Sequence, residues 1–209
     1  MENIRQFSPN MLKTFEICPR KFFYKYVKNI SMPINDEIFE FGKNIHALAS
    51  YYLKKENIDN MEKSLSERER KVWEYLKSCE YFSYEVVNTE YNLVFRQNKY
   101  FFGGRLDALV KKGDEYYILD YKTGSAPKNP KYDFQTMIYL LAVNEFFNTD
   151  KITFVYLDLK NRECIKTEFS QELKEEYLAR LNFVIEKIDS EDYRKIKDEC
   201  SCEYKKICY

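Results

Sequence analysis

Apolar residues recur at helical spacing through the first third of the chain. Ser8 followed by Pro9 predicts the start of a helix, because the hydroxyl can cap the first turn and proline suits the first helical position. The dipeptide Cys18-Pro19 predicts an interruption, since proline cannot continue a helix. Residues 20–27 should resume it, with an apolar side formed by Phe22, Phe23, Tyr26 and Val27.

Two further helices are expected before the pattern changes. Asp36 opens one that runs to about residue 55. Ser66 and Glu69 have the spacing of a capping box, which predicts the start of a third, charged helix. The apolar stripe of the helix from Asp36 consists of Ile38, Phe41, Ile45, Leu48, Tyr52 and Leu53.

From Tyr84 onward the apolar residues alternate, as they do in strands. Turn residues separate several such segments, and Ser170 has the character of a helix cap. The predicted elements are strands 84–96, 99–112 and 115–122, a helix from Pro130 to about Phe147, strands near 151–160 and 162–169, and a last helix to about Ile188.

This order of elements predicts one α/β domain with a mixed sheet. A three-stranded meander comes first, and a helix then separates it from two more strands. No internal repeat or domain boundary interrupts the pattern. We expect residues 1–209 to form one domain, with a helical part (1–83), a sheet core (84–169), and a C-terminal helix with a cysteine-rich tail (170–209).

Composition excludes several classes of protein. Hydrophobic residues make up 44% of the chain and charged residues 33%, which argues against a disordered or collagen-like chain. No stretch resembles a membrane span or a signal peptide, so a cytoplasmic protein that does not contact a membrane is expected. Lys+Arg and Asp+Glu are balanced at 34 each, which argues against unselective coating of nucleic acid. The N-terminal part is nevertheless basic, so a local basic groove stays possible.

The most informative stretch is a predicted hairpin around Gly113-Asp114. This dipeptide suits a two-residue turn with glycine first, and such a turn pairs residues whose numbers add to 227. Asp107 and Asp120 would then face each other, with side-chain carbons about 5 Å apart. Alternation places both acids and Lys122 on one face of the hairpin. The other face is expected to be the core face, with Leu106, Ala108, Val110, Tyr117, Leu119 and Tyr121.

Two facing carboxylates repel each other unless a proton or a cation lies between them. A hard divalent cation with oxygen ligands would satisfy both acids, and Lys122 would point at the same ion. Geometry alone leaves an alternative open, in which Lys122 and Arg105 neutralise two acids on an exposed polar face.

The strings Gly104-Arg105-Leu106-Asp107 and Asp120-Tyr121-Lys122-Thr123-Gly124 resemble the signature of the PD-(D/E)XK nucleases. The similarity is greatest to the RecB-like branch, which includes the AddB nuclease domain and CRISPR-associated RecB-like exonucleases. The resemblance implies a restriction-endonuclease-like core, in which helices flank a mixed central sheet. It also implies that Asp107, Asp120 and Lys122 are catalytic, and that the two acids and the Tyr121 backbone carbonyl bind Mg²⁺ or Mn²⁺.

The segment Gly42-Lys43-Asn44-Ile45-His46 is similar to the family's Gly-x-x-x-His helix, whose histidine is a further metal ligand. His46 is the only histidine in the chain, and its helical neighbours Gly42, Ala49 and Ser50 are small. Small neighbours would let the helix approach the sheet and bring the ring to the shared ion. Without the resemblance, a lone histidine is more simply interpreted as a packing residue.

The segment Gln135-Thr136-Met137-Ile138-Tyr139 is similar to the family's Gln-x-x-x-Tyr helix. Its spacing places Gln135 and Tyr139 on one helix face, and the resemblance assigns them to DNA contact and support of the active site. Other phosphate contacts are expected, by position and charge, at Arg20, Lys21 and Lys128.

Four cysteines match the family branch that carries an iron–sulfur cluster. Cys18 precedes the core, and Cys200, Cys202 and Cys208 follow it, so the resemblance implies a [4Fe–4S] cluster that joins the N- and C-terminal ends. Thiolate ligands suit a structural zinc ion equally well, and a metal-free tail is a third possibility. The gap between Cys200 and Cys202 is one residue shorter than in the family pattern.

The expected function is a metal-dependent deoxyribonuclease, and more specifically an exonuclease. It would hydrolyse single-stranded or duplex DNA ends in repair, recombination or CRISPR adaptation, with Lys122 orienting the attacking water or stabilising transition-state charge. A structure-specific endonuclease is consistent with the same motifs. Two alternatives are a non-catalytic DNA-binding module and an interaction subunit of a helicase–nuclease or CRISPR adaptation complex. The chain carries no helicase domain, so a helicase or CRISPR adaptation protein is an expected partner.

Overall fold

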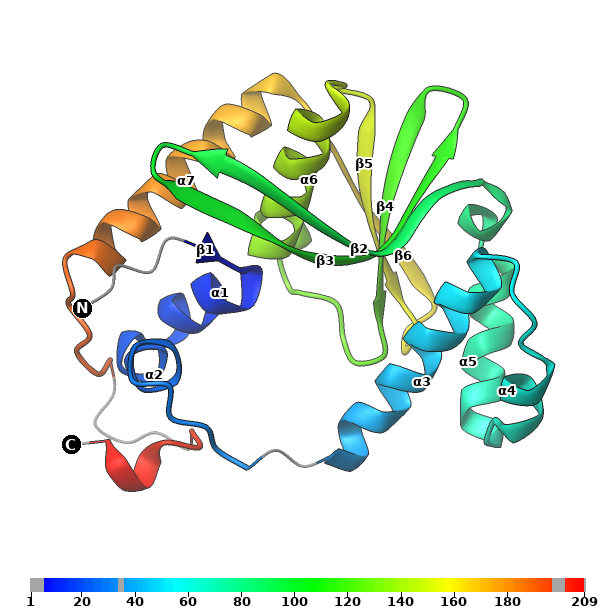
Figure 1. Ribbon diagram of the computed structural model, residues 1–209, viewed down its shortest axis with the longest axis horizontal. Helices are drawn as coiled ribbons and strands as arrows, with labels where there is room; N and C mark the ends of the chain where they lie inside the picture. Colours follow the sequence, from blue (N-terminus) through cyan, green and yellow to red (C-terminus); the bar gives the residue numbers. More distant parts are fainter. Residues whose placement is uncertain (1–5, 34–35, 197–201, 209) are drawn as a thin grey trace.

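The computed structural model describes residues 6–33, 36–196 and 202–208. In these ranges one mixed sheet of six strands lies at the centre, with helices on both of its faces (Figure 1). The strands are β1 (Gln6–Phe7), β2 (Glu85–Gln97), β3 (Tyr100–Lys112), β4 (Glu115–Lys122), β5 (Ile152–Asp158) and β6 (Glu163–Glu168). The α-helices are α1 (Pro9–Ile17), α2 (Pro19–Phe22), α3 (Asp36–Leu53), α4 (Asp59–Ser64), α5 (Glu67–Ser78), α6 (Phe134–Phe147) and α7 (Gln171–Asp189).

The sheet has the mixed topology that the element order predicts. Strands β2, β3 and β4 form an antiparallel meander, and β5 pairs with β6 in the same way. Strand β4 is parallel to β5, because α6 lies between them in the chain and carries it back across the sheet. Strand β1 runs parallel to β3. The sheet order is β1-β3-β4-β5-β6, and β2 pairs with β3 outside that path.

Local sequence signals account for most helix ends. The Ser8 hydroxyl caps α1 by accepting the Met11 N–H at 3.3 Å, and Cys18 ends that helix as expected. The chain then continues as α2 and a π-helical turn (Phe23–Val27), with Phe22 fully buried. Ser66 and Glu69 form the predicted capping box of α5.

The start of α6 was predicted wrongly at Pro130. A short 3₁₀ turn (Pro130–Tyr132) begins there instead, and α6 starts at Phe134. The reason is Asp133, whose carboxylate accepts the Gln135 N–H at 3.0 Å and caps the helix. Strand β1, helix α4 and the 3₁₀ turns Glu80–Ser83 and Lys205–Ile207 were not predicted from the sequence.

Helices cover both faces of the sheet, so both faces are core. Helices α1, α6 and α7 pack on one face, and α3 and α5 pack on the other. Leu106 was expected to share a face with Ala108, and this was wrong. Leu106 packs in the first cluster with Leu109 and Ile118, whereas Ala108 packs in the second with residues of α3. Asp107 also contacts α3, through His46, so the alternation in β3 breaks between Asp107 and Ala108.

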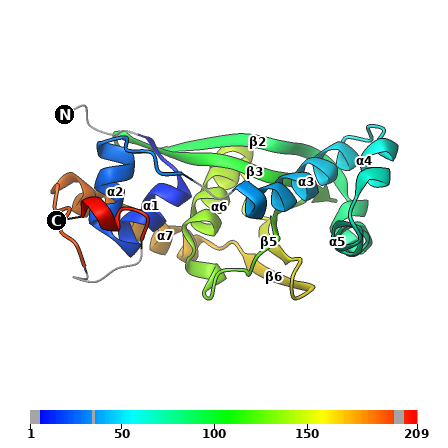
Figure 2. The same cartoon turned by 90° about the horizontal axis from the view of Figure 1, so that it is seen from below.

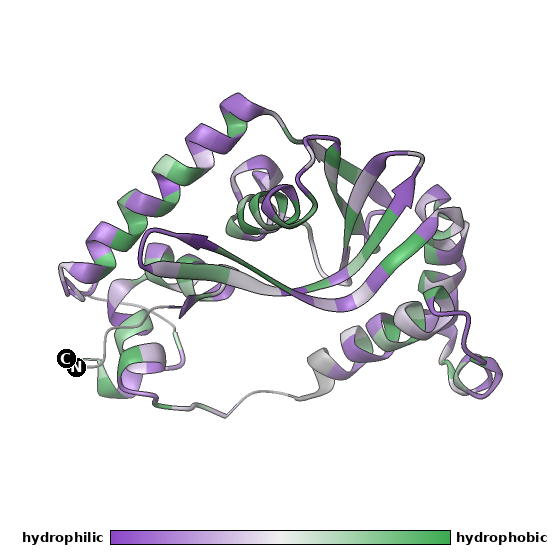
Figure 3. Cartoon of the chain, turned by 45° about the horizontal axis from the view of Figure 1, so that its top comes forward, coloured by the Kyte–Doolittle hydropathy of each residue, from purple (hydrophilic) through white to green (hydrophobic). Residues whose placement is uncertain are grey.

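The helices also divide along the sheet. Helices α1, α2 and α7 lie toward one end of the long β2–β3 ribbon, and α3, α4 and α5 lie toward the other (Figures 1 and 2). Polar and apolar bands alternate along α7, as expected for a helix with one face on the core and one in solvent (Figure 3). No helix in the described ranges combines the length and apolar character required to cross a membrane.

Candidate active site

The β3–β4 hairpin has the predicted register. Paired residues run from Lys112 with Glu115 to Ala108 with Leu119, and each pair of numbers adds to 227. Gly113 takes a positive φ of 64°, which the first position of this turn requires. Asp107 and Asp120 lie one residue beyond the last pair, one on each strand.

The hairpin ladder stops at these acids because Asp107 replaces a backbone partner. Its Oδ2 accepts the Tyr121 backbone N–H at 2.8 Å. Strand β1 pairs with Phe101 and Phe102 along the same edge of β3 that β4 uses from Ala108 onward, since β2 occupies the other edge. Residues 103–107 therefore lie in a gap between β1 and β4, where backbone and side-chain groups of β3 are available to a site.

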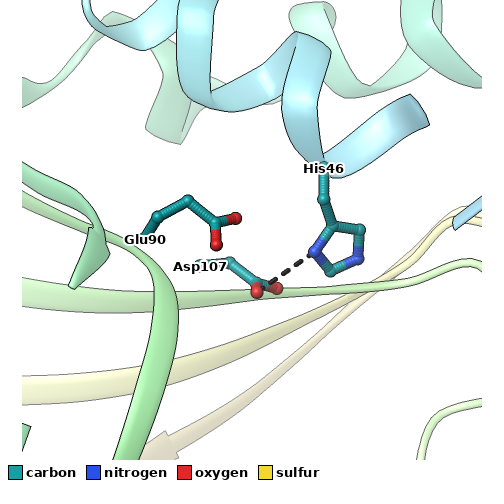
Figure 4. A group of neighbouring side chains, drawn as sticks. All are labelled: His46, Glu90 and Asp107. Atoms are coloured by element: carbon teal, nitrogen blue, oxygen red, sulfur yellow. Dashed lines mark hydrogen bonds and ion pairs between the residues drawn. The ribbon is translucent and has the colours of Figure 1, made fainter. Parts of the chain in front are cut away.

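His46 reaches this gap from α3. Its Nδ1 lies 3.1 Å from Asp107 Oδ1 (Figure 4). Its Nε2 lies 2.9 Å from the Tyr121 carbonyl oxygen. The helix approaches closely because Gly42 faces the end of β4, where an added Cβ would lie 3.3 Å from Thr123 Oγ1. Burial alone would lower the pKa of His46, but the hydrogen bond to Asp107 and the charges of both acids raise it overall.

Asp120 is the most deeply buried acid of the site, with only 3% of its surface exposed. Lys122 Nζ lies 2.6 Å from Asp120 Oδ1 and donates to Gln135 Oε1 at 2.9 Å, while Gln135 Nε2 donates to Asp120 Oδ2. The Lys122 contact lacks hydrogen-bond geometry, so Oδ1 has no hydrogen-bond partner in the described part of the chain. Burial, followed by the charge of Asp107, raises the pKa of Asp120 to about 6, against the opposing effect of Lys122.

Tyr139 supports the β3 segment from α6. Its hydroxyl donates to the Arg105 carbonyl at 2.9 Å, and this carbonyl lies in the gap left by β1 and β4. Gly104 is required for this contact, because an added Cβ would lie 2.9 Å from the Tyr139 hydroxyl oxygen. The structure thus brings Gln135 and Tyr139 to the site, one beside Asp120 and the other beside the strand that carries Asp107.

Glu90 belongs to the site and was missed in the sequence. Its carboxylate converges with His46 and Asp107, with one ligand atom of each within 4.8 Å of the others (Figure 4). The acid also pairs with Arg105, at 2.8 Å. Register could have revealed it, because Thr89 pairs with Ala108 and Tyr91 with Leu106, which leaves Glu90 opposite Asp107. A register shift between Val86 and Asn88 and the positive φ of Glu90, 51°, hide this from a simple alternation pattern.

The donors gathered here fit a hard divalent cation. His46, Glu90 and Asp107 converge, the Tyr121 carbonyl lies next to the imidazole, and one buried oxygen of Asp120 is left without a hydrogen bond. Carboxylate and carbonyl oxygens with one imidazole are typical ligands of Mg²⁺ and Mn²⁺. The raised pKa of the buried Asp120 also indicates that positive charge is missing from the site.

The predicted phosphate contacts lie in different surroundings. The guanidinium of Arg20 lies over the rings of Phe23 and Tyr24, and Lys21 pairs with Glu203 at 3.0 Å. Lys128 is exposed on the loop after β4. Lys21 thus contacts the C-terminal tail. The role of Arg20, Lys21 and Lys128 in binding DNA stays a prediction.

Three of the four predicted cluster cysteines lie in the described ranges. Cys18, Cys202 and Cys208 are half-buried, and Cys200 lies outside the described residues. The tail packs against the segment that follows Cys18, where the hydroxyl of Tyr24 donates to the Ile207 carbonyl at 2.8 Å. The two ends of the described chain are therefore in contact.

A mixed sheet with an acid on each of two paired strands, a lysine two residues after the second acid, and a histidine from a covering helix is typical of a nuclease fold and site of the PD-(D/E)XK type. Residues 6–209 match the PD-(D/E)XK nuclease superfamily, and the chain belongs to it. This confirms the predicted family, the restriction-endonuclease-like fold and the prediction that the protein is a nuclease.

Two individual proteins illustrate the relationship. The chain is 26% identical over 204 residues to the CRISPR-associated exonuclease Cas4 of Francisella tularensis subsp. novicida (strain U112), covering 95% of this chain and 91% of the relative. The crystal structure of a protein from Eubacterium rectale, described as a proposed exonuclease, superposes with a TM-score of 0.59 at 11% identity, covering 95% of this chain and 86% of that one. The second likeness is one of fold.

Proposed function

We propose that the protein is a deoxyribonuclease that uses Mg²⁺ or Mn²⁺ and acts as an exonuclease on single-stranded or duplex ends. The observation that carries this proposal is the convergence of His46, Asp107 and the Tyr121 carbonyl beside Asp120 and Lys122. Family membership supports hydrolysis of nucleic acid, and the Cas4 relative, named as an exonuclease, supports attack from an end.

The residues divide into ligands and organising groups. His46, Asp107, Asp120 and the Tyr121 carbonyl would hold the cation, with Glu90 beside them. A divalent ion bound there would lower the pKa of a water molecule and stabilise the charge that develops on the attacked phosphate. Lys122 keeps its ammonium group at the Asp120 carboxylate, where it can orient the attacking water or interact with a phosphate oxygen.

Gln135 holds the acid and the lysine in place. Its amide nitrogen donates to Asp120 and its amide oxygen accepts from Lys122, so one side chain fixes both groups. Asp107 is fixed in a similar way by the Tyr121 N–H and the His46 ring. The site is thus ordered by its own hydrogen bonds before substrate arrives, as catalysis by fixed charges requires.

End-labelled DNA incubated with Mn²⁺ tests the proposal. The native protein should shorten the strand stepwise, and Asp120→Ala or Lys122→Ala should abolish cleavage while DNA binding persists. Lys112→Ala, which removes a lysine from the opposite end of the hairpin, is the matched control and should cleave normally. Cleavage by Asp120→Ala at the native rate would refute the assignment. Binding without cleavage by the native protein would favour a non-catalytic DNA-binding module.

We also propose that Cys18, Cys200, Cys202 and Cys208 bind a [4Fe–4S] cluster, with structural zinc as the alternative. Contacts between the two ends of the chain support this. Besides the Tyr24 bond, the hydroxyl of Tyr204 donates to the Ile30 carbonyl at 2.8 Å. Protein purified without oxygen should be brown, with broad visible absorption from sulfur-to-iron charge transfer. A colourless protein that contains zinc, or no metal, would exclude the cluster.

The biological setting is proposed from the Cas4 relative. We propose that residues 1–209 act as one nuclease domain in CRISPR adaptation or DNA repair, together with a helicase or other adaptation proteins. Co-purification of the tagged protein with such a partner would support this setting. A fully active nuclease that recovers no partner would favour independent action.

A further inference from the structure

A pocket of about 750 Å³ opens beside the end of β4, immediately after the catalytic strand residues. Thr123, which follows Lys122, lines its floor together with Phe41 of α3. Helix α5 and the turn between β5 and β6 complete the walls. These two elements contribute four cationic side chains, Arg68, Lys71, Lys160 and Arg162.

Most of this positive charge is not neutralised. Lys71 pairs with Glu67 at 2.6 Å on the same helix. In the described ranges Arg68, Lys160 and Arg162 take part in no ion pair. The guanidinium of Arg68 lies 4.3 Å from the centre of the Phe41 ring, which holds it against the wall without cancelling its charge.

The turn that carries Lys160 is fixed to the active site. The Leu159 N–H donates to the Lys122 carbonyl at 2.9 Å, so the turn begins one hydrogen bond from a catalytic residue. Asp158 is 2% exposed and accepts the N–H groups of Lys160 at 3.1 Å and Ala126 at 3.1 Å. This buried carboxylate therefore ties the β5–β6 turn to the loop that follows β4.

Positive charge beside the acids would favour binding of a polyanion. Asp107, Asp120 and Glu90 repel phosphates. Arg105, Lys122 and a bound divalent ion would offset this charge only within the site itself. Cations held at a constant position beside the acids would attract the strand and fix its register relative to the site.

We propose that this pocket binds the phosphodiester backbone of DNA next to the scissile phosphate, through Arg68, Lys160 and Arg162. The proposal rests on the nuclease function proposed above and adds the path of the strand, which runs from the metal-binding residues over Thr123 toward the β5–β6 turn. Asp158 is a positioning residue for this contact.

The test compares two double variants of equal charge. Lys160→Gln with Arg162→Asn removes two pocket cations, and asparagine suits the positive φ of 57° at residue 162. Lys111→Gln with Lys112→Gln removes two cations from the far end of the hairpin and is the control. Circular dichroism checks that both proteins fold.

Binding of a fluorescein-labelled 20-nucleotide oligothymidine is measured by anisotropy in chelator over a range of KCl concentrations. Each lost phosphate contact should reduce the magnitude of the slope of log K against log[salt] by about 0.7. Because two cations are removed, the slope of the pocket variant should be smaller than the native slope by about 1.4. The control should keep the native slope. A native slope in the pocket variant would overturn the proposal.

Cleavage separates this inference from the proposed function. In Mn²⁺ the pocket variant should show a KM raised about tenfold with kcat nearly unchanged, because backbone contacts bind substrate and transition state alike. A native KM in the pocket variant, or a fall in kcat alone, would overturn the inference and leave the nuclease intact. Absence of cleavage by the native protein would refute the nuclease function, while the salt slopes would still report on the pocket.

Discussion

Replacing Asp120 by Asn should stabilise the metal-free protein at neutral pH while abolishing cleavage. Asp120 is 3% exposed, and burial and the charge of Asp107 raise its pKa from 3.8 to about 6. One pKa unit corresponds to about 1.4 kcal/mol, so the ionised carboxylate costs the folded state up to about 3 kcal/mol. Asparagine keeps the shape and the contact with Gln135 without the charge.

The sign of the pH dependence follows from the raised pKa. Below the pKa of the unfolded chain both states are protonated, and Asp120 contributes no penalty. As pH rises toward about 6 the unfolded state releases its proton first, so the folded state loses stability until its own carboxyl ionises. Above that pH the penalty is complete. The increase in the free energy of unfolding caused by Asp120→Asn should therefore be larger at pH 7.5 than at pH 5.

Urea unfolding in chelator, followed by circular dichroism at both pH values, measures this effect. We expect the free energy of unfolding of the variant to exceed that of the native protein by about 1–3 kcal/mol at pH 7.5, and by clearly less at pH 5. Adding Mn²⁺ should stabilise the native protein and leave the variant nearly unchanged, since a ligand that binds only the folded state raises its stability. A variant less stable than the native protein at pH 7.5 without metal would show that the ionised Asp120 carboxylate does not destabilise the folded state.

Two further substitutions test the packing around the site. Gly104→Ala should destabilise the protein by about 1–3 kcal/mol, because the new methyl group would lie 2.9 Å from the Tyr139 hydroxyl, whereas Gly124→Ala meets nothing within 4 Å and is the control. Equal unfolding midpoints for the two variants would contradict this packing. Ser66→Ala should cost about 1 kcal/mol in urea unfolding, since it removes the α5 cap that also anchors Glu69. An unchanged midpoint would show that the capping box contributes nothing measurable.

Features that depend on neighbouring residues could be predicted from the sequence. The turn at Gly113 sets the register of the hairpin, and the observed pairs follow the predicted register as far as Ala108 with Leu119, one residue from the two acids. Caps at Ser8, Ser66 and Ser170 located three helix starts in the same way. The resemblance to the nuclease family brought in His46 from a distant helix, which spacing could not have done.

Features that depend on irregular backbone could not be predicted. The bulge in β2 moves Glu90 out of simple alternation and into the site. Because of the break in β3, Leu106 lies on the sheet face opposite that of Ala108. Leu106 packs there against the apolar residues of α1 and α6. The basic pocket combines residues of α5 with residues from the β5–β6 turn, and only the tertiary fold brings these together.

The most direct test of a shared cation at the acidic site is the Mn²⁺ dependence of DNA cleavage by the native protein and by His46→Ala. Loss of the imidazole removes one ligand and leaves both acids, so His46→Ala should need at least about tenfold more Mn²⁺ for half-maximal cleavage. The native protein should be inactive in chelator. Cleavage in chelator, or the same Mn²⁺ dependence in both proteins, would contradict the account.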